Sequence, residues 1–275
     1  MVDNRLSTQQ VERFREEGYV VVEEPVFAEA RFQALKDHFE RKLTEWEKLG
    51  DASPEHMDTP HFGDPALFEW LFADEVLDLV EPLVGPDIAL WSSHFICKPA
   101  AIGKRVPWHE DSAYWGSVLD PMDVVTVWLA IDPSTPANGC MRVIPGTHLG
   151  GDSEYEAARD RGRSVFATEI KEGRLDESKA VDLVLEPNQC SIHHAKLIHG
   201  SSANTGTMRR CGYTMRYMPT TVRYRPERRD IHGFQIYLGR GADRAANTYA
   251  DPTRANEAYL EANDEQRRRM KAMAH

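Results

Sequence analysis

The chain has 275 residues, of which 41% are hydrophobic and 28% are charged. This length and this apolar content suit a globular protein that buries a substantial core. The net charge of −11, from 33 basic and 44 acidic residues, argues against general binding to nucleic acid or to a membrane surface, because both require a positive field.

The cysteines and the N-terminus bear on the compartment. Cys97, Cys140, Cys190 and Cys211 lie far apart and form no C-x-x-C pair. This spacing is typical of reduced thiols in a cytoplasm rather than of a disulfide framework or a zinc knuckle. The N-terminus has no apolar run of the signal-peptide type, and no apolar stretch reaches membrane-spanning length. We therefore expect a cytoplasmic protein that does not associate with membranes.

Helix signals dominate the first third of the chain. Ser7 and Gln10 have the spacing of a capping box, which starts a helix of about a dozen residues. The run "YVVVEEPV" then has the composition of a strand. Apolar residues at helical spacing, N-cap residues and terminal glycines predict three further helices, at about 28–49, from Asp64, and over about 74–84.

After Pro86 the pattern changes to short strands. Six segments are rich in β-branched or aromatic residues and are separated by Gly, Pro and Asn: "IALWSSHFICK", "VVTVWLAID", "CMRVIPG", "DLVLEP", "CSIHHAKLIHG" and "CGYTMRYM". Such strands, with turn residues between them, predict a sandwich or a barrel. A charged insert over 150–179 has no regular apolar period and is typical of a lid or a binding loop.

We expect a single domain over 1–275 that is mostly β with peripheral α-helices. Its predicted parts are a mainly helical region over 1–85, a barrel core over 86–225 that carries the insert, and a C-terminal extension over 226–275. The charged end of that extension is predicted to be a solvated helix or a frayed tail. No internal repeat or low-complexity linker divides the chain.

The stretch "VPWHEDSAYWG" has the spacing of metal ligands. In an extended segment, residues two apart point to the same side, so His109 and Asp111 can share one site while Glu110 faces away. Two histidines and one carboxylate bind non-haem Fe(II) and leave positions open for co-substrate and O₂. The alternative is that this segment is an ordinary surface turn. The candidates for the second histidine lie in "CSIHHAKLIHGSSANTG" and are His193, His194 and His199.

Arg210 is a candidate for binding a co-substrate. If residues 190–199 form one strand and 210–218 form the next, Arg210 reaches the same cavity from the neighbouring strand. A guanidinium binds a carboxylate through two hydrogen bonds, as a keto-diacid requires at its end remote from a metal. A surface ion pair is the alternative for Arg210, and it is the expected role of Arg209.

Three blocks of the sequence, "WHED…W", "VWLAID…NGCMRVIPGTH" and "HGSSAN…R", resemble in their order and spacing the phytanoyl-CoA dioxygenase family, which includes the ectoine hydroxylases. The resemblance covers about 91–218. It implies an oxygenase that depends on Fe(II) and 2-oxoglutarate and consumes O₂. It also implies a double-stranded β-helix fold, which is a cupin-like jelly-roll barrel with helices packed outside.

The resemblance implies roles for particular residues as well. His109, Asp111 and His199 match the iron ligands of the family. Arg210 matches the arginine that binds the distal carboxylate of 2-oxoglutarate. The residues expected to assist in binding the co-substrate or to line the iron pocket are Ser201, Trp128, His94 and Trp115.

The reaction implied by the resemblance is hydroxylation of a small-molecule substrate with release of succinate and CO₂. Asp111 stands where related halogenases carry a small residue, so halogenation is not expected, although desaturation or ring closure begins with the same hydrogen abstraction. Two alternatives stay open: a cupin-like metal enzyme that does not use 2-oxoglutarate, and a barrel that binds a small molecule without catalysis. The acidic charge disfavours an oxygenase acting on nucleic acid.

Overall fold

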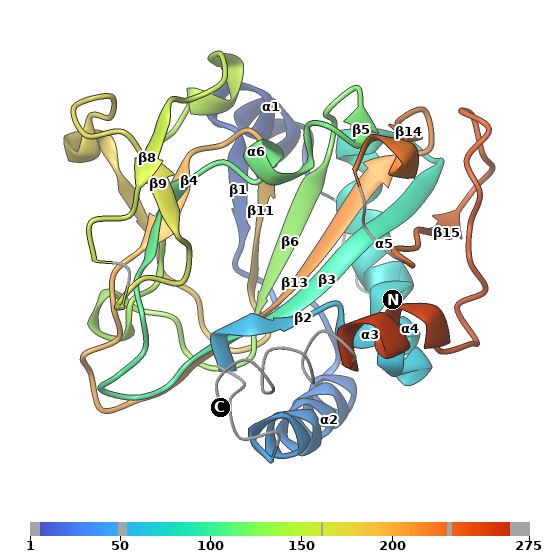
Figure 1. Cartoon of the computed structure of the whole chain (residues 1–275), viewed down its shortest axis with the longest axis horizontal. Helices are drawn as coiled ribbons and strands as arrows, with labels where there is room; N and C mark the ends of the chain where they lie inside the picture. Colours follow the sequence, from blue (N-terminus) through green and yellow to red (C-terminus); the bar gives the residue numbers. More distant parts are fainter. Residues whose placement is uncertain (1–5, 49–53, 161, 230–232, 265–275) are drawn as a thin grey trace.

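The computed structural model describes residues 6–48, 54–160, 162–229 and 233–264. Two antiparallel sheets form its centre, and helices and loops surround them (Figure 1). The larger sheet has the strand order β1-β11-β6-β13-β3-β15, with β2 paired to β3. Its strands are β1 (Tyr19–Val22), β2 (Met57–Asp58), β3 (Ile88–Lys98), β6 (Val125–Ala130), β11 (Cys190–His194), β13 (Arg210–Pro219) and β15 (Tyr237–Arg240).

The smaller sheet has the strand order β10-β7-β12-β4. Its strands are β4 (Val106–His109), β7 (Met141–Val143), β10 (Val181–Leu183) and β12 (His199–Ser201). Two short ribbons pair β5 (Leu119–Asp120) with β14 (Arg223–Tyr224) and β8 (Tyr155–Ala157) with β9 (Thr168–Ile170). The arrangement is the jelly-roll barrel with outer helices that the resemblance implies, so the predicted fold class is confirmed.

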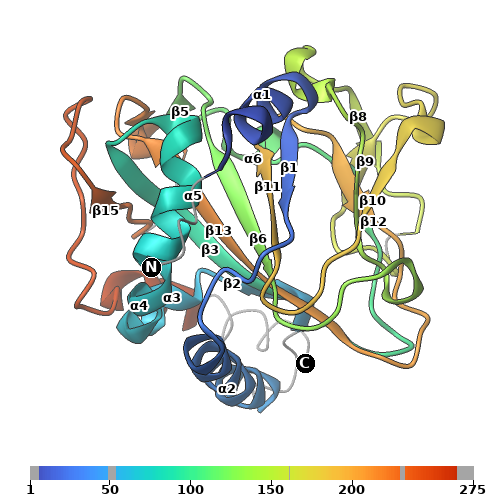
Figure 2. The same ribbon diagram turned by 180° about the vertical axis from the view of Figure 1, so that it is seen from behind.

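The helices lie at the periphery. The α-helices are α1 (Thr8–Glu17), α2 (Glu29–Glu47), α3 (Pro60–Gly63), α4 (Phe68–Leu71), α5 (Asp74–Val84) and α6 (Ser112–Trp115). The 3-10 helices are η1 (Pro54–His56), η2 (Pro65–Leu67), η3 (Pro136–Asn138), η4 (Thr147–Leu149), η5 (Glu177–Lys179) and η6 (Pro226–Arg228). Figure 2 shows α5 against the face of the larger sheet, where it contacts β3, β6 and β13. Within the described ranges, no helix has both the length and the apolar composition needed to cross a bilayer.

Most of the predicted helices are confirmed. Ser7 and Gln10 form the capping box at the start of α1. The second helix lies inside the predicted range 28–49, and α5 spans the predicted 74–84. Asp64 is an N-cap as predicted: its side chain accepts a hydrogen bond from the backbone N–H of Ala66 at the start of η2, and α4 follows η2 directly.

Alternation along β13 divides the larger sheet into a packed face and a face that lines a cavity. Tyr213, Met215 and Tyr217 are buried in the main apolar core together with the helices. Thr214 and Arg216 lie between them in sequence and line the cavity on the opposite face. The apolar core therefore packs against one face of the larger sheet, and the other face lines the cavity.

The prediction of one strand over 190–199 is wrong. β11 ends at His194, and β12 begins at His199 in the other sheet. The chain turns between them, with the backbone N–H of Leu197 donating to the His194 carbonyl at 2.9 Å. Because β11 pairs with β1 and β6 whereas β12 pairs with β4 and β7, Arg210 reaches the cavity from the larger sheet and not from a neighbour of β12.

Two segments outside the barrel core reach the cavity. In the insert over 150–179, β8 and β9 form a ribbon, and Val165 and Phe166 between them line the cavity. The C-terminal segment is helical over 257–264, and the rest of the charged tail lies outside the described residues. Tyr259 packs against Phe62 with ring centroids 4.7 Å apart and also lines the cavity. The prediction of a purely solvated C-terminal helix is therefore wrong for its first turns.

Cys97 and Cys211 form a disulfide between β3 and β13. The register of these two strands sets the residues directly opposite each other, although 114 residues separate them in the sequence. The prediction of four reduced thiols is wrong for this pair, because it depended on sequence spacing alone. Cys140 and Cys190 are free and buried.

Candidate metal centre

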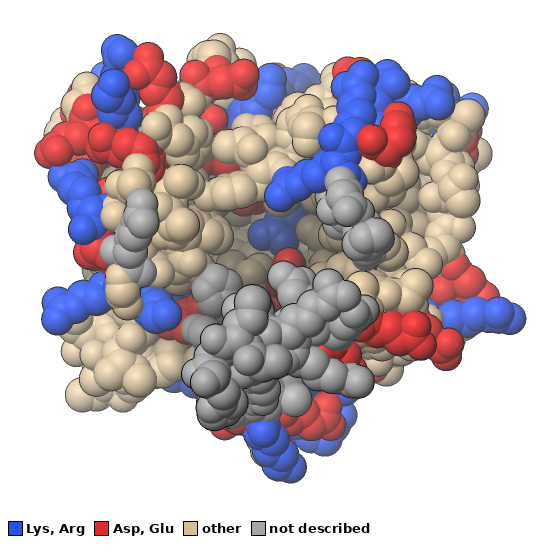
Figure 3. Space-filling model, in the orientation of Figure 1, with Lys and Arg blue, Asp and Glu red and all other residues tan. Residues whose placement is uncertain are grey.

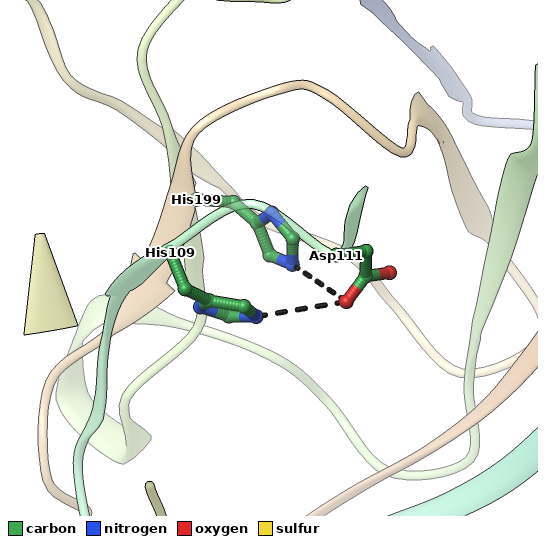
Figure 4. Close-up of side chains that lie close together, drawn as sticks. All are labelled: His109, Asp111 and His199. Carbon is green, nitrogen blue, oxygen red and sulfur yellow. Dashed lines mark ion pairs between the residues drawn. The ribbon is translucent and has the colours of Figure 1, made fainter. Parts of the chain in front are cut away.

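Two strands of the smaller sheet and the turn that follows one of them bring three donor side chains together. His109 on β4 and His199 on β12 are paired residues in adjacent strands, and their ring centroids are 4.1 Å apart. Asp111 follows β4 with helical backbone angles, φ −58° and ψ −35°, at the start of α6. The chain therefore bends directly after β4, and Asp111 points back at the two rings (Figure 4).

The three donors are close enough to share one ion. His109 Nε2 lies 3.7 Å from Asp111 Oδ1, and His199 Nε2 lies 4.0 Å from the same oxygen. All three donor atoms lie within 4.8 Å of one another, and all three residues are buried. Glu110 points away, as predicted, and accepts a hydrogen bond from Ser153 Oγ at 2.7 Å.

Backbone carbonyls fix the orientation of both imidazoles. His109 Nδ1 lies 2.8 Å from the Pro107 carbonyl, and His199 Nδ1 lies 2.9 Å from the Leu197 carbonyl. Each Nδ1 therefore carries the proton and donates it, which leaves the Nε2 lone pair directed at the shared site. Two such nitrogens and one carboxylate fit the facial ligand set of non-haem Fe(II).

Electrostatics keep these donors in the forms that a metal requires. Although burial alone raises the pKa of Asp111, the nearby positive charge of Arg216 and the contacts with His109 and His199 lower that pKa well below its usual range. Burial, together with the charges of His109 and His193, lowers the pKa of His199 well below its usual value. Asp111 is therefore ionised and His199 is neutral at pH 7.

Two buried basic side chains, Arg210 and Lys98, form a second cluster, and Arg210 lines the same cavity. Arg210 on β13 is the cross-strand partner of Lys98 on β3. Lys98 Nζ donates to Ser201 Oγ and to the Ser202 carbonyl, both at 2.6 Å, and Arg210 Nη2 donates to Ser201 Oγ at 3.4 Å. Among the described residues, neither cation forms an ion pair with a carboxylate within 4 Å. Burial lowers the pKa of Arg210 to about 10 and that of Lys98 to about 6.

Trp128 on β6 packs against Arg210 of this pair. The Arg210 guanidinium lies 5.2 Å from the centroid of the Trp128 ring. The indole in turn lies over Gly212, where an added Cβ would collide with Trp128 Cζ2. Glycine at this position therefore gives the indole the space in which it supports Arg210.

The remaining predicted residues line the same cavity at different points. His94 on β3 has Nε2 3.1 Å from the Glu55 carbonyl and Nδ1 3.9 Å from Asp58 Oδ1. Trp115 at the end of α6 lies over the Arg216 guanidinium, at 5.1 Å from its ring centroid. His94 thus faces the η1–β2 segment, and Trp115 faces β13 beyond the metal centre.

The cavity has a volume of about 440 Å³ and contains all eight predicted site residues. Figure 3 shows the hollow in this face of the molecule, with basic side-chain atoms inside it. The volume falls within the roughly 300–1,000 Å³ typical of small-molecule sites. The predicted residues are His94, His109, Asp111, Trp115, Trp128, His199, Ser201 and Arg210.

Sequence reasoning missed Lys98 and Arg216 and left His193 unresolved. His193 lines the cavity, its ring centroid lies 4.7 Å from that of His199, and neither of its ring nitrogens has a partner among the described residues. His194 does not line the cavity, since neighbouring residues of β11 point to opposite faces. The available signal for Lys98 and Arg216 was their even spacing from His94 and Arg210 within strands that were already predicted.

Comparisons with known proteins agree with this site. Residues 14–212 match the family model for phytanoyl-CoA dioxygenase (PhyH). A probable phytanoyl-CoA dioxygenase of Caenorhabditis elegans is 30% identical over 213 residues, which cover 74% of this chain and 66% of that protein. A probable alpha-ketoglutarate-dependent hypophosphite dioxygenase of Stutzerimonas stutzeri is 28% identical over 176 residues, which cover 62% and 58%. The matches thus span less than two thirds of either relative.

A solved structure supports the same relationship. The non-heme monooxygenase ThoJ, in its apo form, superposes with a TM-score of 0.74 at 26% sequence identity. The superposition covers 94% of this chain and 93% of that protein. With a family model that matches most of its length, a jelly-roll barrel, and a buried His-Asp-His cluster at the matching positions, the chain belongs to the phytanoyl-CoA dioxygenase family.

Proposed function

We propose that this protein is an Fe(II)- and 2-oxoglutarate-dependent oxygenase that hydroxylates a small-molecule substrate and releases succinate and CO₂. One observation carries the proposal: a single cavity is lined by a His-Asp-His cluster and, apart from it, by Arg210. Arg210 and its cross-strand neighbour Lys98 are buried basic side chains without a carboxylate partner among the described residues. Such a pair matches the distal carboxylate of a keto-diacid. The family relationship and the named co-substrate of the Stutzerimonas relative support the proposal.

In this proposal His109, Asp111 and His199 hold the metal. Fe(II) supplies, when bound, the redox chemistry that couples oxidation of a 2-oxo acid by O₂ to oxidation of the substrate. The protein supplies position and charge. The Pro107 and Leu197 carbonyls hold the two imidazoles in the required tautomer, and the ionised Asp111 offsets part of the metal charge.

The cation pair binds and orients the co-substrate. Arg210 offers a planar fork to the distal carboxylate, and Lys98 adds a second charged donor from the neighbouring strand. Ser201 contacts both cations and helps to hold them, and Trp128 supports the guanidinium. Because this end of the cavity is buried, the charge-assisted hydrogen bonds are stronger than they would be in water.

Asp111 bears on the type of reaction. Its carboxylate occupies the position at which a halide-binding site would need a small residue, which supports hydroxylation over halogenation. The Lys98–Arg210 pair disfavours the cupin-like alternative, since an enzyme that does not use 2-oxoglutarate has no need of a diacid site. The whole chain as one domain, with parts at 1–85, 86–225 and 226–275, and the cytoplasmic location stay predictions.

A spectroscopic titration tests the proposal. Fe(II) and then 2-oxoglutarate are added to the metal-free protein without oxygen, and we expect a weak visible absorption band that requires both additions. Arg210→Gln should remove the band at 2-oxoglutarate concentrations that saturate the wild type, while Fe(II) still binds. Arg209→Gln is the matched control, because Arg209 pairs with Glu40 and Asp132 outside the cavity. Iron binding without any band would contradict the proposal and favour the cupin-like enzyme.

A further inference from the structure

A second buried arginine lies on the same face of β13 as Arg210. Arg216 follows it by six residues, is 8% exposed and lines the cavity. Its cross-strand neighbours are Thr126 on β6 and Ser92 on β3, and Thr126 is in turn opposite His193 on β11. A row of polar side chains therefore crosses four strands of the sheet beyond the metal centre.

The protein uses the hydrogen-bonding capacity of Arg216 only weakly. Nη1 donates to Ser92 Oγ at 3.4 Å, and Nε has no hydrogen-bond partner among the described residues. The Nε atom lies 3.6 Å from Asp111 Oδ2, which is longer than a hydrogen bond. Trp115 lies over the guanidinium and fixes its plane.

A β-bulge supplies a second unpartnered donor beside Arg216. Arg216 pairs with Ser92 and Tyr217 pairs with Leu90, so Trp91 is the extra residue. The bulge lets both Trp91 and Ser92 line the cavity. Trp91 Nε1 is buried without a hydrogen-bond partner in the described part of the chain.

Aromatic rings surround this corner of the cavity. The Trp91 ring contacts Phe234 at 4.5 Å and Trp115 at 6.1 Å between centroids. Glu55 and Asp58, the other carboxylates that line the cavity, lie beside His94 on a different segment. Asp111 is the carboxylate that faces Arg216, and a divalent ion at the His-Asp-His cluster would offset its charge. Arg216 then remains as a buried cation with an unused donor next to apolar rings.

We propose that Arg216, Ser92 and Trp91 bind a carboxylate of the primary substrate, whose apolar or aromatic body lies against Trp91, Trp115 and Phe234. The inference rests on the proposed function and names the substrate class of the same cavity: small monocarboxylic acids. Arg210 and Arg216 are six residues apart along one strand, or about 20 Å between Cα atoms. In this inference Arg210 binds the distal carboxylate of the co-substrate, and Arg216, next to Ser92 and Trp91, binds a different anion.

Ligand binding can be measured without turnover. The probes are 4-fluorophenylacetate and its neutral counterpart 4-fluorophenylacetamide, followed by fluorine NMR on protein loaded with Zn(II) and N-oxalylglycine. We expect the wild type to bind the acid about tenfold more tightly than the amide. Arg216→Gln should abolish this preference, and Trp91→Phe, which keeps the ring and removes the donor, should reduce it.

Matched variants separate this inference from its alternatives. Arg223→Gln, which removes an exposed arginine outside the cavity, should leave the acid-to-amide ratio unchanged. Equal binding of acid and amide by the wild type, or a ratio that survives Arg216→Gln, would overturn the inference. Weaker Zn(II) binding by Arg216→Gln with an intact ratio would also overturn it and make Arg216 a positioning residue for Asp111. Failure of N-oxalylglycine to bind the wild type would instead count against the proposed function.

Discussion

Lys98 is a buried lysine, and among the described residues its Nζ donates only to neutral acceptors, Ser201 Oγ and the Ser202 carbonyl. Burial and the positive charge of Arg210 lower its pKa to about 6, against smaller opposing effects of Glu55 and Cys140. At neutral pH the free protein therefore holds Lys98 mainly uncharged. A carboxylate placed beside it favours the charged form and raises this pKa.

Binding of 2-oxoglutarate should therefore be linked to proton uptake by Lys98. The affinity is expected to be highest below pH 6, where Lys98 is already charged, and to fall as the pH rises above 6. Calorimetry at pH 7.5 in two buffers of different ionisation enthalpy counts the protons taken up. Lys98→Met should abolish the uptake, and an unchanged proton count in that variant would assign it to another group.

The metal ligands and the missed cations differ in what sequence can reveal about them. His109 and Asp111 are two residues apart, and the motif blocks identify His199 and Arg210. Local sequence spacing and the family resemblance were therefore enough to predict these four residues. Asp111 nevertheless has helical backbone angles and not the extended form that the spacing argument assumed. Lys98 acquires its role only through cross-strand pairing with Arg210, and register of this kind is not a local property.

At the scale of elements, strand alternation explains most of the site. Arg210, Thr214 and Arg216 of β13 line the cavity, and the odd-numbered residues between Arg210 and Arg216 enter the core. Strand patterns predicted β3 and β13 well. The break between β11 and β12 was missed because "HHAKLIH" contains no glycine or proline. The chain breaks there because the two strands pair with different sheets.

Gly212→Ala tests how β13 and β6 cooperate. The new methyl group would meet the Trp128 indole, which must then move away from Arg210. We expect 2-oxoglutarate affinity to fall at least about tenfold while Fe(II) affinity is retained, because one charge-assisted contact is displaced. Titration of the visible band measures both affinities. Parallel loss of both would show that the substitution disrupts the sheet and not one contact.

At the scale of the whole molecule, the metal centre links two strands of the smaller sheet, which carry His109 and His199, to Asp111 on the segment that leads from β4 toward β6 of the larger sheet. A ligand that binds only the folded state adds about 2.7 kcal/mol at one hundred times its Kd. For a chain of this size that corresponds to a rise in Tm of about 5–10 °C. Metal binding should therefore be visible as thermal stabilisation.

Asp111→Asn and Glu110→Gln form a matched pair for this measurement. Both remove a buried carboxylate, but only Asp111 faces the two histidines, whereas Glu110 contacts Ser153. We expect Glu110→Gln to keep the metal-induced rise in Tm and Asp111→Asn to lose it. A rise that persists in Asp111→Asn would remove Asp111 from the ligand set.

The position of both arginines on β13 has a consequence for the shape of the cavity. β13 is hydrogen-bonded to β3 on one side and to β6 on the other, so the separation between its residues is fixed by the pleat. The length of the cavity, taken between the Cα atoms of the two arginines, is then constant. Its width depends on how far the smaller sheet and the β8–β9 ribbon stand from the larger sheet. Adaptation to ligands of different thickness is therefore confined to one dimension, across the strands.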